Sequence, residues 1–308
     1  VMSRFKNVAV MGTGAMGPGM GAVMARAGMA VRMYDTRPEA IEAAKGMYDM
    51  AWGVLDKLET PDQGGGSVSY ATDVAEALGG VDAVVEAVPE KLELKKQVFA
   101  EYEQHAGPDA VLMSNTSGIP ITKIAEDLQH PERVIGTHWS NPPHLIPMIE
   151  VIPGEQTSEA TVDATVEMIN DVGYVPSRIK KEVPGFVENR ILYAIMRECL
   201  ALVDEGVVDL DELDTNVKWG IGYKLAVIPP MQLLDMAGLD IYSAVASYLN
   251  QDLSNEQGLS TTIQKLVDEG RLGIKTKGGI FDYDDEKIAQ LRAQRFGGLV
   301  KVRKALSD

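Results

Sequence analysis

Val8-Ala9-Val10-Met11-Gly12-Thr13-Gly14-Ala15-Met16-Gly17 is the stretch of sequence that decides the fold. Its first four residues are apolar and predict a buried strand, and the glycines that follow predict a tight turn into a helix over Gly19 to Ala27. A second strand is predicted from Val31 to Tyr34, and Asp35 ends it. Strand, glycine turn, helix, strand and acid in this order predict the first βαβ unit of a dinucleotide-binding domain of the Rossmann type.

The glycine turn has a physical rationale at each glycine. Gly12 permits the tight turn, Gly14 lets a pyrophosphate approach the backbone, and Gly17 lets helix and strand pack closely. We therefore predict that the turn from Gly12 to Gly17, with Ala15 and Met16, binds the cofactor at the helix N-terminus. Asp35 is placed to accept hydrogen bonds from the adenosine ribose, and its charge would repel a 2′-phosphate, which favours NAD over NADP. Arg37 could instead approach a 2′-phosphate, although a solvated turn residue is the commoner interpretation.

The rest of the chain divides into two parts near Pro184. Before this point, short apolar runs alternate with helical patterns, which is typical of a parallel sheet covered by helices. The predicted strands are Val68 to Tyr70, Ala83 to Glu86, Ala110 to Met113, Val134 to Thr137, Met148 to Ile152 and Tyr174 to Ile179. After it, the patterns are helical: Phe186 to Val203, Leu210 to Trp219, Met231 to Ala237, Ile241 to Asn250 and Thr261 to Glu269. We predict an α/β chain with a Rossmann-type domain over residues 1–184 and an all-α domain over residues 185–308.

Composition excludes several classes of function. With 308 residues, 45% hydrophobic and 24% charged, the chain has the makeup of an ordinary globular protein. A net charge of −16 argues against binding to nucleic acid or to anionic membranes. No apolar stretch approaches the roughly 20 residues that span a bilayer, and no signal region precedes the first strand, so we expect a cytoplasmic protein. The single cysteine, Cys199, lies in an apolar helical run, where a buried hydrophobic residue is likelier than a nucleophile.

A histidine and a glutamate form the candidate catalytic pair. His138 precedes Asn141-Pro142-Pro143, which forces a turn and places the histidine at the rim of the domain. Glu150 interrupts an apolar strand, where an unpaired carboxylate would cost several kcal/mol, so it needs a partner or a wet edge. His138 is the obvious partner. Such a pair, after a dinucleotide-binding start, supplies proton transfer coupled to hydride transfer.

Other polar residues are less informative by themselves. Asn115-Thr116-Ser117 follows a predicted strand, so it is either a ligand site at the carboxyl end of a parallel strand or ordinary turn chemistry, and the pattern does not separate the two. His105 and His130 lie in polar stretches and are predicted to be surface residues. His144 is close to His138, but no carboxylate or cysteine completes a set of ligands at useful spacing, so we expect no metal.

Several motifs in order resemble the 3-hydroxyacyl-CoA dehydrogenase family, and the resemblance extends from Gly12 through Gly270-Arg271-Leu272-Gly273-Ile274-Lys275. The motifs that carry it are Gly12 to Gly17, Val85 to Glu90 with Lys95, Asn115 to Ser117, His138 to Pro142, Glu150, Pro184 to Arg190, and Leu233 to Asp240.

The resemblance implies roles for these residues. It implies that His138 is the general acid/base, that Glu150 orients and polarises it, and that Ser117 and Asn189 bind the substrate oxygen and the nicotinamide region. It further implies that Glu90 and Lys95 hold the nicotinamide-side ribose. Asn115 and Asn141 would line the same cleft beside the cofactor. The family is dimeric through its helical domain, so a homodimer is expected.

Two departures from the family pattern bear on the substrate. Members that use acyl-CoA carry a long helical hairpin with basic residues after the second strand, whereas only Thr36 to Gly66 is available here, and Lys57 is the sole base from Leu55 to Gly66. The aromatic pair that usually follows the catalytic histidine is replaced by Trp139-Ser140. The stretch from Asn141 to Pro147 is similar to the branch of the family that acts on free small acids, such as carnitine and gulonate dehydrogenases.

Three interpretations of function follow. The leading one is an NAD-dependent dehydrogenase of a small, carboxylated substrate without coenzyme A, with Asn141, Trp139, Arg190 and Lys224 as candidate substrate residues. Arg190 and Lys224 could equally be surface or interdomain ion-pair residues. The second interpretation is an L-3-hydroxyacyl-CoA dehydrogenase with a reduced CoA site. The third is a non-catalytic, nucleotide-binding structural protein, against which the presence of both His138 and Glu150 argues.

Overall fold

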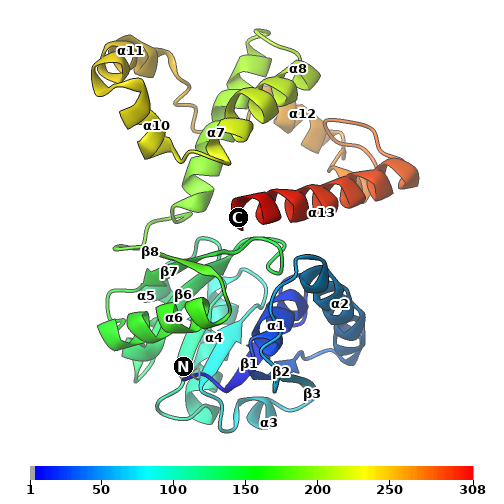
Figure 1. Ribbon diagram of the computed structural model, residues 1–308, viewed down its shortest axis with the longest axis vertical. Helices are drawn as coiled ribbons and strands as arrows, with labels where there is room; N and C mark the ends of the chain where they lie inside the picture. Colours follow the sequence, from blue (N-terminus) through cyan, green and yellow to red (C-terminus); the bar gives the residue numbers. More distant parts are fainter. Residues whose placement is uncertain (1–3, 308) are drawn as a thin grey trace. The chain divides into compact units, whose positions relative to one another are not determined.

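The computed structural model describes residues 4–307 and divides into two compact units, residues 1–189 and 190–308 (Figure 1). The sequence analysis expected the boundary after residue 184. The observed boundary lies later because the segment from Gly185 to Asn189 forms hydrogen bonds with Glu150 and Ser117 of the first unit. No helix of the described chain is long and apolar enough to cross a membrane.

The first unit is built on one eight-stranded sheet with the strand order β3-β2-β1-β4-β5-β6-β7-β8. All neighbouring strands run parallel except β6 and β7, which pair antiparallel. The strands are β1 (Asn7–Met11), β2 (Ala30–Tyr34), β3 (Ser67–Ala71), β4 (Ala83–Glu86), β5 (Val111–Ser114), β6 (Val134–Trp139), β7 (Met148–Pro153) and β8 (Val175–Arg178). This order confirms the Rossmann-type arrangement, in which the strand order reverses between β1 and β4.

Helices cover both faces of this sheet. Val8 and Val10 of β1 belong to one apolar cluster, and Ala9 and Met11 belong to another, as the two-residue repeat of a strand requires. The first cluster contains residues of α1 (Gly17–Arg26), α2 (Pro38–Lys57) and α6 (Glu159–Asp171). The second contains residues of α3 (Val74–Leu78), α4 (Leu92–His105) and α5 (Ile121–Ala125). A short 3₁₀ turn, η1 (Pro131–Arg133), leads into β6.

The second unit is helical, as predicted. Its helices are α7 (Glu188–Asp204, whose first two residues belong to the first unit), α8 (Leu210–Thr215), α9 (Tyr223–Leu225), α10 (Pro230–Ala237), α11 (Leu239–Asp252), α12 (Thr261–Asp268) and α13 (Asp285–Ser307). The helix expected over Leu210 to Trp219 ends at Thr215 and continues as a π-helix, η2 (Asn216–Gly222). A 3₁₀ turn, η3 (Ile274–Thr276), lies within a small bridged loop.

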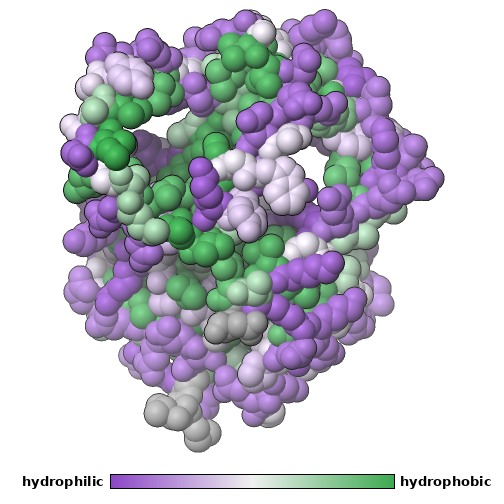
Figure 2. All heavy atoms as spheres, turned by 45° about the horizontal axis from the view of Figure 1, so that its top comes forward, coloured by the Kyte–Doolittle hydropathy of each residue, from purple (hydrophilic) through white to green (hydrophobic). Residues whose placement is uncertain are grey.

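The second unit buries little of its own apolar surface. Among its described residues, Ile288 is the one buried hydrophobic residue, whereas Trp219, Met231 and Met236 are 63–72% exposed. Figure 2 shows hydrophobic side chains, coloured green, at the surface among these helices. Contiguous apolar surface of this kind is typical of a protein that is covered by a partner.

Candidate functional site

The glycine turn forms a backbone cradle between β1 and α1. Gly12 has a φ of 110°, and a Cβ there would lie 2.6 Å from the carbonyl oxygen of Ala87, so only glycine fits. A Cβ on Gly17 would lie 2.1 Å from the carbonyl oxygen of Gly12. A Cβ on Gly14, in contrast, meets no protein atom within 4 Å, which leaves this side open to a ligand. The turn lines a cavity of about 570 Å³ together with Asp35 and the segment from Ala87 to Pro89, which follows β4.

Asp35 lines this cavity and is held in place by hydrogen bonds from the glycine turn. Its Oδ2 accepts hydrogen bonds from Thr13 N at 3.0 Å and Thr13 Oγ1 at 3.1 Å. Burial alone would raise the pKa of Asp35, but the hydrogen bonds from Thr13 and Arg37 outweigh it and hold the pKa below its usual value. The carboxylate is therefore charged at neutral pH. Arg37 is exposed, with its Nε 3.4 Å from Asp35 Oδ1. An open backbone cradle and a fixed carboxylate fit the pyrophosphate and the adenosine ribose of NAD.

Glu90 and Lys95, which the sequence predicts at the nicotinamide-side ribose, lie close together: Glu90 is in the segment after β4, and Lys95 is in the first turn of α4. Lys95 Nζ is 3.2 Å from Glu90 Oε2, and Glu90 Oε1 accepts hydrogen bonds from Thr116 Oγ1 and Ser117 N. Burial raises the pKa of Glu90, but the bonds from Thr116 and Lys95 lower it below its usual value overall. This network joins the end of β4 to the end of β5.

The sequence analysis missed the group that holds Lys95. Both oxygens of Glu86 accept hydrogen bonds from Lys95 Nζ, at 2.7 and 2.8 Å, and both side chains are buried. Ser114 Oγ and Val88 N also donate to Glu86. Burial raises the pKa of Glu86, and its donors oppose that shift. The signal was present, because a glutamate that ends an apolar strand nine residues before a lysine needs a buried partner.

His138 and Glu150 meet as expected. They face each other in the register of β6 and β7, and His138 Nδ1 lies 2.8 Å from Glu150 Oε2. Both residues are buried. Burial would raise the pKa of Glu150, but His138 and the backbone N–H groups of Glu188 and Val187 lower it below its usual value overall. A charged Glu150 fixes the tautomer of His138 that carries its proton on Nδ1, which leaves Nε2 to exchange a proton with a substrate.

A tight loop delivers two more donors to Glu150. Gly185 and Phe186 have φ angles of 77° and 50°, so the chain reverses there, and the N–H groups of Val187 and Glu188 donate to Glu150 Oε1 at 3.0 and 3.1 Å. Phe186 is fully buried, with its ring centroid 5.9 Å from that of His138. Because α7 begins at Glu188, the positive end of a helix dipole faces the carboxylate.

Ser117 and Asn189 are also brought together. Asn189 Nδ2 donates to the Ser117 carbonyl oxygen at 3.0 Å, and Ser117 is exposed. Asn115 lies beside them and accepts a hydrogen bond from Trp139 N at 2.9 Å. The hydrogen bonds of Asn115 to Ser117 connect neighbouring strand ends, and the role of this stretch in binding the cofactor stays a prediction.

Four other predicted site residues make no hydrogen bond with His138 or Glu150 among those described above. Trp139 belongs to the apolar core and packs on Tyr174 with ring centroids 5.7 Å apart, because successive side chains of β6 point to opposite faces. Asn141 is exposed at the turn and precedes a cis peptide bond to Pro142. Arg190 and Lys224 are exposed residues of the second unit and remain predictions for the substrate. Cys199 is half-buried, and burial raises the pKa of its thiol.

One group of side chains meets the distance requirement for metal ligands. Ligand atoms of His138, Glu150 and Glu188 lie within 4.8 Å of one another. The sequence analysis did not include Glu188, because its approach to the pair depends on the reversal at Phe186. His138 and Glu150 already bind each other, so the arrangement is first of all a proton-transfer pair with a second carboxylate beside it.

Comparisons with known proteins show the family of the chain. Residues 7–183 match the model of the 3-hydroxyacyl-CoA dehydrogenase NAD-binding domain, and residues 185–283 match the C-terminal domain of the same family. The chain is 48% identical over 303 residues to 5-formyl-3-hydroxy-2-methylpyridine 4-carboxylate 5-dehydrogenase of Mesorhizobium japonicum, covering 98% of each chain. The stretches from His138 to His144, Val183 to Asn189 and Trp219 to Ile228 already resemble that enzyme in sequence.

Two further relatives support the assignment. A solved structure of such a 5-dehydrogenase, described as an NAD⁺-dependent dismutase, superposes with a TM-score of 0.96 at 48% identity, covering 98% of this chain and 99% of that one. A probable 3-hydroxybutyryl-CoA dehydrogenase of Deinococcus radiodurans is 33% identical, covering 89% of this chain and 99% of the relative. With the glycine cradle, the fixed Asp35 and the His138 and Glu150 pair in place, the chain belongs to the 3-hydroxyacyl-CoA dehydrogenase family and uses NAD.

Proposed function

We propose that this NAD-dependent dehydrogenase oxidises a small carboxylated substrate that is not linked to coenzyme A, and that the substrate is 5-formyl-3-hydroxy-2-methylpyridine-4-carboxylate. The observation that carries the proposal is the buried pair of His138 and Glu150 at the end of β6 and β7. The similarity over nearly the whole chain to a 5-dehydrogenase of this pyridine supports the choice of substrate.

The pair supplies acid/base chemistry. His138 Nε2 accepts the hydroxyl proton as the substrate is oxidised, while Glu150 stabilises the imidazolium through Nδ1. NAD, when bound, accepts the hydride. In the reverse direction the imidazolium returns the proton. Ser117 and Asn189, which are joined by a hydrogen bond, would hold the substrate oxygen beside the histidine.

An aldehyde substrate requires water as well. Its hydrate would lose one proton to His138 and a hydride to NAD, which leaves the carboxylic acid and NADH, and His138 then passes that proton to solvent. A thiohemiacetal route would need a reactive thiol, and Cys199 does not fit because burial raises its pKa. The NADH formed could reduce a second aldehyde to the alcohol, which is the reaction that a dismutase performs.

The segment after β2 favours a substrate without coenzyme A. A single helix, α2, follows β2, and residues 58–66 then lead directly into β3. From Leu55 to Gly66 the only base is Lys57, so this segment offers little positive charge to the phosphates of coenzyme A. The second candidate, an L-3-hydroxyacyl-CoA dehydrogenase, is supported by the family models and by the relative from Deinococcus radiodurans.

The deciding experiment is NADH absorbance after mixing the enzyme and NAD with each substrate separately. Turnover of the pyridine aldehyde, with little or none of L-3-hydroxybutyryl-CoA, is the expected result. Turnover of the CoA ester alone would overturn the proposed substrate and favour the second candidate. Chromatography of the products would show whether acid alone or acid and alcohol in equal amounts are formed, which separates simple oxidation from dismutation.

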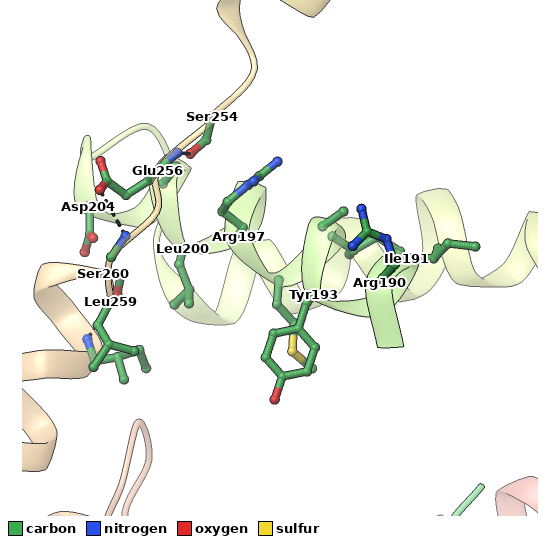
Figure 3. Close-up of a pocket in the computed structure, with 16 residues that line it drawn as sticks. Arg190, Ile191, Tyr193, Arg197, Leu200, Asp204, Ser254, Glu256, Leu259 and Ser260 are labelled. Atoms are coloured by element: carbon green, nitrogen blue, oxygen red, sulfur yellow. Dashed lines mark hydrogen bonds between the residues drawn. The ribbon is translucent and has the colours of Figure 1, made fainter. Parts of the chain in front are cut away.

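We also propose that the protein is a cytoplasmic homodimer. The second unit leaves an apolar groove of about 860 Å³ on α7, and Figure 3 shows Tyr193 and Leu200 among its lining residues, with Leu259 from the segment before α12. A unit of this size with one buried hydrophobic residue among its described residues cannot be stable in water by itself. A second copy of the same helices would bury this surface.

A further inference from the structure

A second carboxylate lies beside the catalytic pair and is built into the fold. Ligand atoms of Glu188, Glu150 and His138 lie within 4.8 Å of one another. Ser140 Oγ donates a hydrogen bond to Glu188 Oε2, while the Glu188 backbone N–H donates to Glu150 Oε1. Ser140 directly follows β6, two residues after His138. The Glu188 carboxylate is thus fixed toward the pair from two directions.

This arrangement is unfavourable while His138 is neutral. Two carboxylates this close repel each other, and both are at least half-buried, so water screens the repulsion only in part. The ion pair that the structure shows for Glu150 is with His138, which carries a charge only when protonated. A fold that keeps a second negative charge at this point therefore gives up stability in the resting state.

The repulsion is relieved when His138 takes a proton. An imidazolium whose ring nitrogen lies within 4.8 Å of an oxygen of each carboxylate is stabilised by both charges, so the interaction is stronger in the charged transition state than in the resting enzyme. Only interactions of this kind accelerate the chemical step. Because Glu188 comes from the loop that also aims two N–H groups at Glu150, the same segment holds both acids in register with the histidine.

We propose that Glu188 is a positioning residue whose carboxylate, held by Ser140, stabilises the imidazolium that forms on His138 during substrate oxidation. The step is a proton transfer from the substrate hydroxyl to His138 Nε2, with the hydride going to NAD, and Glu188 neither gains nor loses a proton. The inference rests on the proposed role of His138 as proton acceptor, and it does not depend on which substrate is oxidised.

The test separates the charge of Glu188 from its hydrogen bond. Glu188→Gln keeps the side-chain length and an oxygen that accepts from Ser140, and it removes the charge. We expect kcat for oxidation to fall about tenfold, the effect of losing one charge at this range from a group that becomes cationic. KM for NAD should stay within about twofold of wild type, because no NAD contact is assigned to Glu188. Tm should rise or stay constant, because a repulsion is removed.

Two controls make the result specific. Glu182→Gln makes the same chemical change in the same loop at a residue that binds Thr122 N, and it should leave kcat unchanged. Ser140→Ala keeps the charge and removes the tether, so its loss in kcat should be smaller than that of Glu188→Gln. The kinetics are measured with whichever substrate, the pyridine aldehyde or L-3-hydroxybutyryl-CoA, the wild-type enzyme turns over.

Three results would overturn the inference. They are a wild-type kcat for Glu188→Gln, a fall in kcat accompanied by a fall in Tm, and loss of wild-type activity with EDTA that is restored by a divalent metal, which would make the three residues a metal site. Failure of the proposed function has a different signature, since it appears in the wild-type enzyme as lack of turnover of the pyridine aldehyde. The Tm comparison needs no substrate, and a Tm of Glu188→Gln below that of wild type would by itself contradict the repulsion on which the inference rests.

Discussion

His138 is the residue on which the proposed chemistry depends most directly. His138→Ala should lower kcat by about 10²–10⁴-fold, the usual loss for a positioned acid/base. NAD binding should be retained, because the glycine turn and Asp35 are held by contacts that do not involve His138. Stopped-flow or steady-state NADH formation measures the first, and protein fluorescence quenching by NAD measures the second. A variant with an unchanged rate would remove His138 from the mechanism.

Glu150 makes the pair sensitive to acid. Its folded-state pKa lies below the usual value, so the unfolded chain takes up this proton first as the pH falls. The stability that Glu150 contributes is therefore fully present above the usual glutamate pKa of about 4.3 and is lost as the pH falls through the lower folded-state pKa. Scanning calorimetry from pH 7 to pH 3 should show Glu150→Gln less stable than wild type at neutral pH, with the gap narrowing below about pH 4.3. A gap independent of pH would contradict this.

For single residues, the sequence predicts those parts of the site that a local motif or a periodic pattern of apolar residues reveals. His138 and Glu150 could be paired because a carboxylate in an apolar strand needs a partner, and the structure joins them. Glu188 and Ser140 could not be predicted, because their meeting depends on the left-handed backbone of Phe186, a conformation that a bulky residue seldom adopts. Trp139 is predicted as a substrate residue because it follows His138 in the sequence. Strand alternation packs its side chain in the apolar core, and its role toward the substrate stays a prediction.

At the scale of the element, the turn between β1 and α1 contains two glycines with different roles. Gly17 is required by the fold, and Gly14 is expected to be required for binding NAD. Gly17→Ala should destabilise the protein by several kcal/mol or prevent folding, because its Cβ would lie 2.1 Å from a carbonyl oxygen. Gly14→Ala meets no protein atom within 4 Å, so Tm should hardly change while NAD affinity falls. Thermal unfolding and NAD titration measure the two effects.

Gly46→Ala, at a position in α2 where a Cβ meets no protein atom within 4 Å, is the control for these variants. It should raise the free energy of unfolding by about 0.5–1 kcal/mol. Equal loss of NAD affinity in the control would contradict the assignment.

Strands were easier to predict than the ends and connections of elements. The limits of β4 agree with the prediction at both ends, because an apolar run buried on both faces has a sharp compositional edge. β6 extends two residues further than predicted, to Trp139, because its pairing with β7 continues to Ile149 and pairing partners are not visible in one strand's sequence. The π-helix η2 lies in a run whose apolar spacing is compatible with an ordinary helix, so a sequence pattern offers no signal for it.

For the whole molecule, the division into an α/β part and a helical part follows from the change of period after Pro184. The exact boundary does not, because Gly185 to Asn189 are held by Glu150 and Ser117, residues far away in sequence. The loop thereby belongs to the site although the helix it starts belongs to the other unit. Glu150 accepts a hydrogen bond from His138 and another from the loop. The same carboxylate therefore takes part in the proposed chemistry and holds the loop on the first unit.

The helical unit also makes a prediction for the molecule as a whole. If a second copy covers α7, stability must depend on protein concentration, because association favours the folded chain. Tyr193→Asp, at a side chain that is 68% exposed in one chain and lines the groove on α7, should give a monomer with a Tm lower than wild type. Met50→Asp makes a comparable change at an apolar residue of α2 that is 53% exposed, and it should leave the dimer intact. Analytical ultracentrifugation of the wild type and both variants over a hundredfold range of concentration, with Tm measured at the lowest and highest concentrations, tests whether a dimer forms through the groove on α7. A wild-type monomer with a Tm independent of concentration would mean that the apolar helices are covered in some other way than by a second copy of this chain.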